Sequence, residues 1–226
     1  VGGMLLGITI FLFIGEPIFI ITDITIISVG LFSLFFTTLF LDIDLERPSK
    51  SIWRVFISST LFNVVVLLVI NLVFFGIPGL FLFFASIIGL LAVFLTIVFT
   101  TYYTRIEYGP TKKVVFASDV SPSVNILSGL STGFKSTFGP VVIFVISVVA
   151  SYIFGYYTGI VYSKILGLEG MTPALFFIAF GIYGVNMASC SSDVIISTIL
   201  SFDTFGPIAD NAAGIAQMAG DESPNG

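Results

Sequence analysis

Two aspartates near the end of the chain have the spacing of residues that act together. Asp203 and Asp210 are seven residues apart, almost two turns of an α-helix, so on one helix they would lie on nearly the same face. Asn211 follows the second aspartate within an otherwise apolar stretch. A carboxylate inside a membrane helix costs several kcal/mol unless it faces water, an ion or a partner. The pair therefore predicts a polar, water-filled site that binds a cation.

Carboxylate and amide oxygens suit a hard cation such as Mg²⁺. This ion is usually held by one or two carboxylates together with waters and the phosphate oxygens of a substrate. It can then clamp a phosphoryl group and activate water. Two aspartates alone do not complete such a site. From the residues, three interpretations stay open: an ion or substrate path, a metal–phosphate site, and a structural polar patch without a ligand.

The composition is that of a membrane protein with several spans. Of the 226 residues 57% are hydrophobic and only 9% are charged, whereas soluble domains carry about 25% charged residues. The sequence contains no histidine, which removes the usual proton relay at neutral pH. Its single cysteine, Cys190, is expected to be a small apolar filler on a helix. No basic stripe supports binding of nucleic acid.

Apolar stretches of about one bilayer thickness predict an all-α, polytopic transmembrane bundle with about five full spans and a partial first one. The partial span covers residues 1–14, and Glu16-Pro17 forms a short break after it. The full spans are expected at residues 24–41, 55–75, 80–100 and 139–160, and from Pro173 onward. We expect both ends of the chain to be internal to a larger protein.

Two charged loops determine the predicted orientation. Residues 42–54 and 105–113 together hold six of the eight Lys and Arg residues, and the turn between the two spans that separate these loops holds none. Because basic residues accumulate in cytoplasmic loops, both loops are predicted to be cytoplasmic. The cytoplasmic half of the last helix would then carry Asp203 and Asp210. For Asp193, higher on that helix, a role in transport and capping by its neighbouring serines both stay open.

At residues 202–218 the sequence reads FDTFGPIADNAAGIAQM, which resembles the D-x-[YF]-G-P-[IV]-x-D-N-A-G-G-I-A-E-M signature of membrane-bound, ion-pumping pyrophosphatases. Three further segments resemble family segments in order and spacing. They are VGLFSLFFTTLF at residues 29–40, TTYYT at residues 100–104 and NILSGLSTGFKSTFGPVV at residues 125–142. The resemblance covers nearly the whole chain.

The resemblance implies a homodimer of chains with about sixteen helices, in which residues 1–226 would be one transmembrane domain. Such enzymes hydrolyse pyrophosphate to phosphate in a Mg²⁺-dependent cytoplasmic site. They couple this reaction to outward movement of H⁺ or Na⁺ across a cell membrane or the membrane of an acidic compartment. K⁺ is a candidate second cofactor. The fragment alone is not expected to be active.

The resemblance also implies roles for the residues that match the signature. Asp210 matches the aspartate of the Mg–pyrophosphate site and would be a metal ligand. Asp203 matches the first aspartate of the signature, deeper toward the ion path, and Asn211 would orient these groups. The sequence names no catalytic base.

Three other residues receive weaker assignments. The Gly206-Pro207 pair is expected to break the helix, so that it can open around a ligand. Lys135 matches a lysine found in some members, where it would belong to the ion path or its coupling. An interfacial lysine that reaches for lipid headgroups is an equal alternative.

Several positions depart from the family pattern. Thr101 stands where many members carry Glu, Gln217 stands where the signature has Glu, and Ala213 replaces the first of two glycines. The other acidic motifs of the family, of the D-N-V-G-D-N-V-G-D and D-x-x-x-K-D types, are not in this sequence. Two alternatives to a pump therefore stay open: a secondary ion transporter or channel without hydrolysis, and a divergent, inactive paralogue.

Overall fold

The structure, a computed structural model, describes residues 2–40, 48–165 and 174–220, and every regular element in these ranges is an α-helix. Residues 42–47 of the predicted charged loop at residues 42–54 lie outside these ranges, and residues 48–54 are helical instead of forming a loop. Eight helices run through the described ranges: α1 (Gly2–Ile14), α2 (Ile18–Phe40), α3 (Pro48–Phe75), α4 (Gly79–Thr104), α5 (Gly109–Ser118), α6 (Pro122–Ile165), α7 (Ala174–Asp193) and α8 (Ile196–Met218).

Five stretches of the described residues are helical, long and apolar enough to cross a membrane, and α1 is a shorter apolar helix. The prediction of an all-α bundle with five full spans and a partial first one is confirmed. The predicted start of the first full span is wrong, because α2 begins at Ile18 instead of Ile24. This difference moves Asp23 from a loop into the helix.

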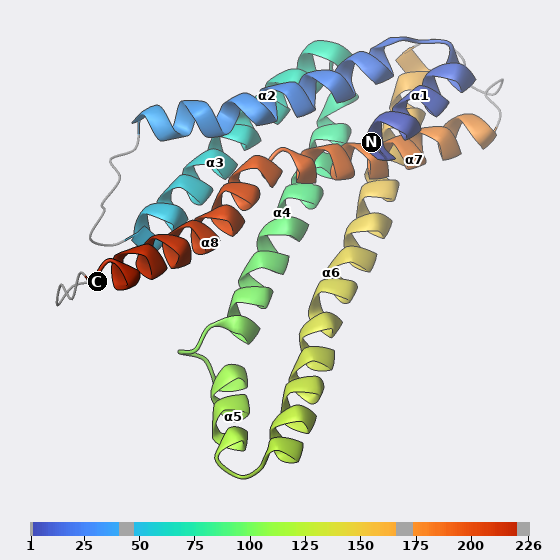
Figure 1. Ribbon diagram of the computed structural model, residues 1–226. Helices are drawn as coiled ribbons and strands as arrows, with labels where there is room; N and C mark the ends of the chain where they lie inside the picture. Colours follow the sequence, from blue (N-terminus) through green and yellow to red (C-terminus); the bar gives the residue numbers. More distant parts are fainter. Residues whose placement is uncertain (1, 41–47, 166–173, 221–226) are drawn as a thin grey trace.

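Helices α4 and α6 run side by side, and α5 connects them at the far end of the molecule (Figure 1). Helix α7 packs against both of them through small residues. Gly155 of α6 faces Gly184 of α7 so closely that a Cβ atom on either would overlap the backbone of the other helix. Gly89 of α4 approaches the backbone of Ala188 in the same way. Small residues at helix contacts let membrane helices approach closely.

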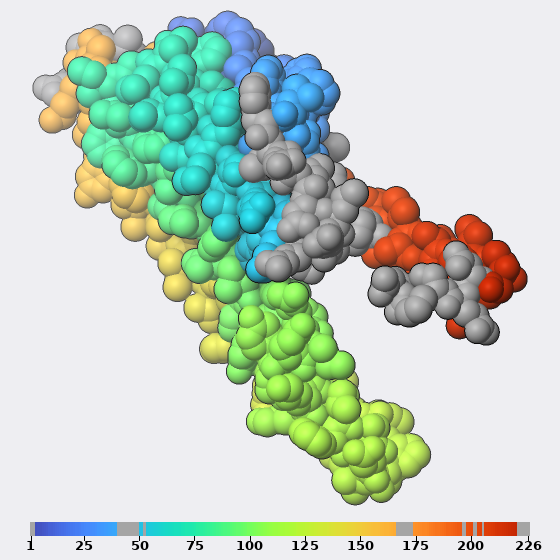
Figure 2. Space-filling model, turned by 90° about the vertical axis from the view of Figure 1, so that its left-hand side faces the viewer, coloured from blue at the N-terminus to red at the C-terminus, as the bar shows by residue number. Residues whose placement is uncertain are grey.

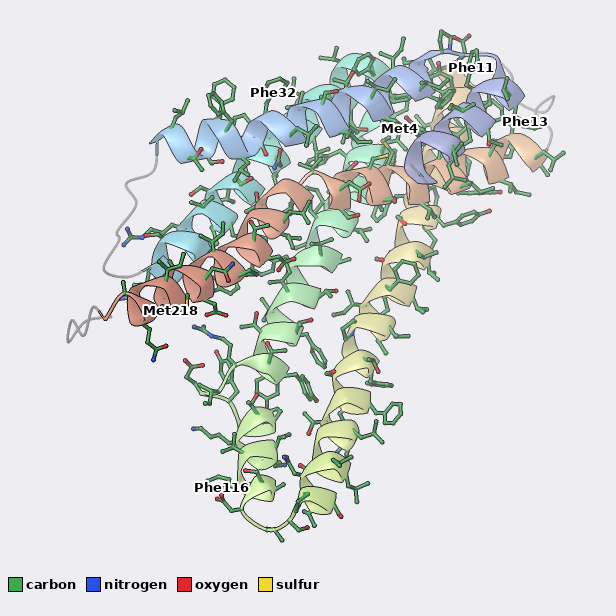
Figure 3. The ribbon with its side chains drawn as sticks, viewed as in Figure 1. Met4, Phe11, Phe13, Phe32, Phe116 and Met218 are labelled. Atoms are coloured by element: carbon green, nitrogen blue, oxygen red, sulfur yellow. The ribbon has the colours of Figure 1, made fainter. Side chains whose placement is uncertain are left out.

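Aromatic rings fill the core where α2, α3 and α7 meet. The ring of Phe19 lies 4.8 Å from that of Tyr183 and 5.5 Å from that of Phe180, both in edge-to-face geometry. Many other phenylalanines lie on the outer surface, among them Phe32, which is 62% exposed, and Phe116 (Figure 3). An apolar outer surface is what a bundle surrounded by lipid tails presents.

The helix α6 does not begin at Gly139, where the sequence predicted a span to start. It runs from Pro122 to Ile165 and continues through Gly139 and Pro140. A proline inside a helix removes one backbone hydrogen bond, and in a long helix the other bonds keep the axis continuous. The serine- and glycine-rich stretch before Gly139 is therefore the first part of this same helix.

The predicted last span is divided into two helices, and the division is not at the expected place. Helix α7 ends at Asp193 and α8 begins at Ile196, whereas α8 continues through Gly206 and Pro207. The predicted break at Gly206-Pro207 is therefore wrong. Residues 206–210 are all exposed. Water can therefore bond to the backbone carbonyl that the proline leaves without its helical hydrogen bond. The C-terminal part of α8 stands clear of the body of the molecule (Figure 2).

Candidate functional site

The helix α8 carries the polar residues that the sequence singled out. Asp203, Asp210 and Asn211 all lie on this one continuous helix, and all three side chains are exposed. With 3.6 residues per turn, the seven-residue spacing places the two carboxylates on nearly the same face. The helix therefore presents a row of oxygen donors to whatever lies against this face.

Pro207 frees a further oxygen atom, the backbone carbonyl of Asp203, that could bind a cation beside this row. A proline has no N–H group, so residue 207 cannot make the helical hydrogen bond to the carbonyl of residue 203. The backbone carbonyl of Asp203 thus lacks its usual hydrogen-bond donor, the N–H of residue 207. This carbonyl lies close to the carboxylate of the same residue. A carbonyl beside a carboxylate is a pair of oxygens that hard cations accept.

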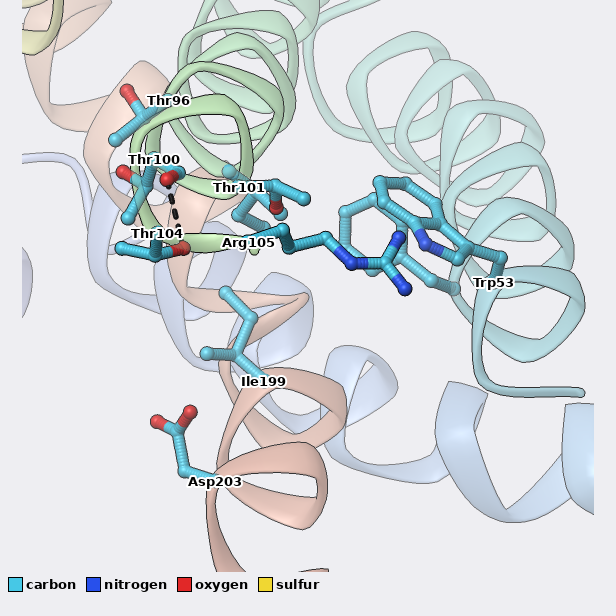
Figure 4. Close-up of a pocket in the computed structure, with 10 residues that line it drawn as sticks. Trp53, Thr96, Thr100, Thr101, Thr104, Arg105, Ile199 and Asp203 are labelled. Carbon is cyan, nitrogen blue, oxygen red and sulfur yellow. Dashed lines mark hydrogen bonds between the residues drawn. The ribbon is translucent and has the colours of Figure 1, made fainter. Parts of the chain in front are cut away.

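Asp203 also lines a groove of about 610 Å³ between α3, α4 and α8 (Figure 4). In the close-up, Arg105 extends toward Trp53, while Asp203 points into the groove from the opposite side. The groove thus holds a carboxylate, a guanidinium and several hydroxyl groups. Its lining residues are Trp53, Phe56, Thr96, Ile97, Thr100, Thr101, Thr104, Arg105, Ile199 and Asp203.

The end of α4 positions the guanidinium. Arg105 follows the last residue of this helix with extended backbone angles (φ −78°, ψ 141°), and its N–H bonds to the carbonyl of Thr101. Its Nε lies 3.6 Å from Oε2 of Glu107, and both side chains are exposed. Exposed ion pairs contribute about 0–1 kcal/mol, so Glu107 holds the guanidinium only weakly.

The structure does not bring all the predicted residues together. Asp210 and Asn211 lie farther along α8 and do not line the groove that contains Asp203. Lys135 lies on α6, where it lines a separate shallow groove with apolar residues of the same helix. The pairing of Lys135 with Asp203 in one ion path therefore stays a prediction.

Sequence reasoning missed Arg105 and Trp53 as groove residues. In the sequence Arg105 serves only as one of the loop charges that predict orientation, and nothing there gives Trp53 a role. The TTYYT segment ends one residue before Arg105, and this was the available signal. Trp53 lies near the start of α3, and only the packing of α3 against α4 and α8 brings it to the groove.

The donors on α8 fit a Mg²⁺ ion held between protein and phosphate. Among the described residues, no three acidic, cysteine or histidine side chains come together as an all-protein metal site. Mg²⁺ rarely needs such a cage, because one or two carboxylates, waters and substrate phosphates usually complete its six ligands. Asp210, Asp203 and the carbonyl of Asp203 are donors of that kind.

The profile of the family described as "Inorganic H+ pyrophosphatase" matches residues 1–225. The chain belongs to this family. It is therefore a multi-pass integral membrane protein, in agreement with its five apolar helices. The family assignment confirms the resemblance that was drawn from the signature at residues 202–218.

Relatives of this chain include pumps for different ions. It is 30% identical over 224 residues to a K⁺-insensitive pyrophosphate-energized proton pump of Moorella thermoacetica, with 97% of the chain covered. It is 34% identical over 137 residues, 61% of the chain, to a K⁺-insensitive pyrophosphate-energized proton pump of Methanosarcina mazei. It is also 34% identical over 136 residues, 60% of the chain, to a candidate K⁺-stimulated pyrophosphate-energized sodium pump of Bacteroides thetaiotaomicron.

The chain spans a minor part of the length of these relatives. The matched region covers 30% of the Moorella thermoacetica relative, 18% of the Methanosarcina mazei relative and 16% of the Bacteroides thetaiotaomicron relative.

Proposed function

We propose that residues 1–226 form one transmembrane domain of a pump that hydrolyses pyrophosphate to phosphate and moves H⁺ or Na⁺ out of the cytoplasm. The observation that carries this proposal is the exposed acidic face of α8, whose sequence matches the pyrophosphatase signature. This face continues into a groove that also contains a guanidinium group. Further helices of the full-length protein complete the site.

In this proposal the chain contributes metal ligands and phosphate contacts. The carboxylate of Asp210 holds Mg²⁺, and the amide of Asn211 orients it. Arg105 donates to pyrophosphate oxygens, since guanidinium groups match phosphate geometry. Asp203 lies at the inner end of the row, where the ion path begins. Bound Mg²⁺ supplies charge neutralisation and a more acidic water molecule for attack on phosphorus.

The proposal extends to the assembly of the pump. A homodimer and a K⁺ requirement are the two properties that the family resemblance adds. Cross-linking in native membranes tests the first, because a dimer gives a band at twice the mass of the full-length protein. Hydrolysis with and without K⁺ tests the second.

One observation favours an inactive paralogue as the alternative. Thr101, which stands where many members carry Glu, lines the same groove as Asp203. A hydroxyl there cannot ligate a metal as a carboxylate does. Under this alternative the full-length protein folds in the membrane and leaves pyrophosphate intact, and Thr101→Glu adds a missing donor.

The deciding experiment uses the full-length protein in sealed vesicles with the predicted cytoplasmic side outward. Addition of Mg²⁺ and pyrophosphate should release phosphate and move H⁺ or Na⁺ into the vesicles. A folded protein that releases no phosphate overturns the pump and favours the inactive paralogue. Phosphate release without ion movement overturns the coupling alone.

The substitution Arg105→Gln should raise the KM for Mg-pyrophosphate about tenfold and change kcat less. Loss of a charged hydrogen bond to phosphate costs about 1.5–3 kcal/mol, and 1.4 kcal/mol corresponds to a factor of ten. Steady-state phosphate release measures both constants. Lys113→Gln is the matched control, because Lys113 is exposed on α5 and does not line the groove. Equal effects of the two substitutions would contradict a local role for Arg105.

A further inference from the structure

A second carboxylate site lies in the interior of the bundle, away from α8. Asp23 of α2 is 1% exposed and lies among the aromatic residues of the core. The hydropathy pattern leaves Asp23 outside the predicted span, which begins one residue later. A buried carboxylate in a membrane needs a partner, an ion or a proton to balance its charge.

The side chains of α7 that make hydrogen-bond contacts with the carboxyl group of Asp23 are neutral. Nδ2 of Asn186 donates a hydrogen bond of 2.8 Å to Oδ2 of Asp23. The hydroxyl oxygen of Tyr183 lies 3.4 Å from Oδ1 of Asp23 and 3.2 Å from the carbonyl oxygen of Phe19. Among the described residues, no Lys or Arg forms an ion pair with Asp23.

The number of protons in this network decides the state of the carboxyl group. Tyr183 has one O–H hydrogen but more than one oxygen neighbour: the carbonyl of Phe19, the carboxyl group of Asp23 and the hydroxyl of Thr22. Its contact with the carbonyl of Phe19, which can only accept, is shorter than its contact with Asp23. If Tyr183 donates to Phe19, the contact with Asp23 needs a hydrogen from Asp23 itself. A protonated Asp23 satisfies both contacts of its own carboxyl group: its O–H donates to Tyr183, and its other oxygen accepts from Asn186.

The surroundings offer no room for a hydrated cation. A Cβ atom on Gly7 of α1 would overlap Oδ2 of Asp23, and one on Gly3 would lie 2.8 Å from Sγ of Cys190. Helix α1 thus closes directly over the cluster. The titratable groups of α7 that face the cluster are Tyr183 and Cys190, and the thiol of Cys190 donates to Oδ1 of Asn186 over 4.0 Å.

Other polar groups near Asp23 are already engaged. The hydroxyl of Thr22 donates to the carbonyl of Ile18 at 2.7 Å, so its hydrogen does not serve the carboxyl group. Asp193, farther along α7, is a second acid. Neither group supplies a positive charge to Asp23.

We propose that Asp23 is an intramembrane proton-binding site, in which the α1–α2–α7 interface holds the carboxyl group in its protonated form through Tyr183 and Asn186. The predicted orientation places it near the non-cytoplasmic end of α2, about 24 Å along the helix axis from Leu39. Asp203 and its groove belong to the opposite, cytoplasmic half. The proposed site does not depend on hydrolysis of pyrophosphate, so its test is independent of the test of the proposed function.

Infrared spectroscopy of the full-length protein in membranes tests this site. The difference between wild type and Asp23→Asn at neutral pH should contain the C=O stretching band of one protonated carboxylic acid, and this band should shift in D₂O. Asparagine reproduces the shape and donor pattern of a protonated aspartate. The melting temperature of Asp23→Asn should therefore stay within about 2 °C of wild type.

Two further variants test the assignment of the band to Asp23. Tyr183→Phe removes the acceptor of the carboxyl hydrogen and should move the band to higher wavenumber, as for a weakly bonded acid. Glu107→Gln, which removes an exposed carboxylate, should leave the band unchanged. Absence of the band in the wild type, or its appearance only after Na⁺ is removed, overturns the proposal, because Asp23 would then be ionised and balanced by a cation.

Discussion

Replacing Asp210 with asparagine should lower Mg²⁺-dependent hydrolysis of pyrophosphate by about 100-fold or more, which corresponds to about 2.7 kcal/mol in the activation barrier. An amide oxygen is a neutral and weaker ligand than a carboxylate, so the variant holds Mg²⁺ poorly beside the substrate. The side chain is exposed on α8, so the change leaves helix packing intact. Phosphate release by the full-length protein in membranes gives the measurement.

The matched control for Asp210 is Asp119→Asn. Asp119 is an exposed aspartate at the end of α5. Its replacement by asparagine removes one negative charge, as Asp210→Asn does, but at a position away from α8. It should retain hydrolysis close to that of the wild type. Partial recovery of Asp210→Asn at high Mg²⁺ would support the role of a ligand. Full activity at ordinary Mg²⁺ would exclude Asp210 from the metal site.

Hydropathy predicted the fold class well and the helix ends poorly. Five apolar stretches of bilayer length admit only helices, because lipid offers no hydrogen bonds to an open sheet edge. The start of α2 was misplaced because Asp23 looked like the boundary of a span, whereas Tyr183 and Asn186 satisfy it inside the core. These partners come from a helix that is distant in sequence, so no local pattern reveals them.

The two prolines show why local breakers mislead in long helices. Pro140 and Pro207 each remove one backbone hydrogen bond, yet α6 and α8 continue through them. The chain divides instead at residues 194–195, where no proline or glycine stands. Both of these residues are buried, so tertiary packing accompanies the division where the local sequence gives no breaker.

The candidate site was predictable along one helix and not across helices. The spacing of Asp203 and Asp210 was enough to expect a row of oxygens, because both lie on the same element. Arg105 and Trp53 join Asp203 only through the meeting of α3, α4 and α8. Sequence reasoning assigned Arg105 to a charged loop that it predicted to be cytoplasmic, yet without the fold it gave no contact.

Replacing Gly155 with valine should strongly destabilise the packing of α6 against α7. A Cβ at this position would overlap the carbonyl oxygen of Phe180 and the Cα of Gly184, which are backbone atoms that cannot rotate away. Helix α7 would have to separate from α6, and the small-residue contact that joins them would be lost. We expect a cost of about 3 kcal/mol, at the upper end of typical overpacking.

Gly129→Val separates this packing effect from the effect of valine on a helix. Gly129 lies on the same helix, α6, and nothing described lies within 4 Å of a Cβ built on it. Valine and glycine have similar, modest helix propensities, so this variant should melt within about 2 °C of wild type. Gly155→Val should melt about 6–12 °C lower. Equal melting temperatures for the two variants would contradict the close α6–α7 contact, and with it the rigid scaffold from which α8 extends.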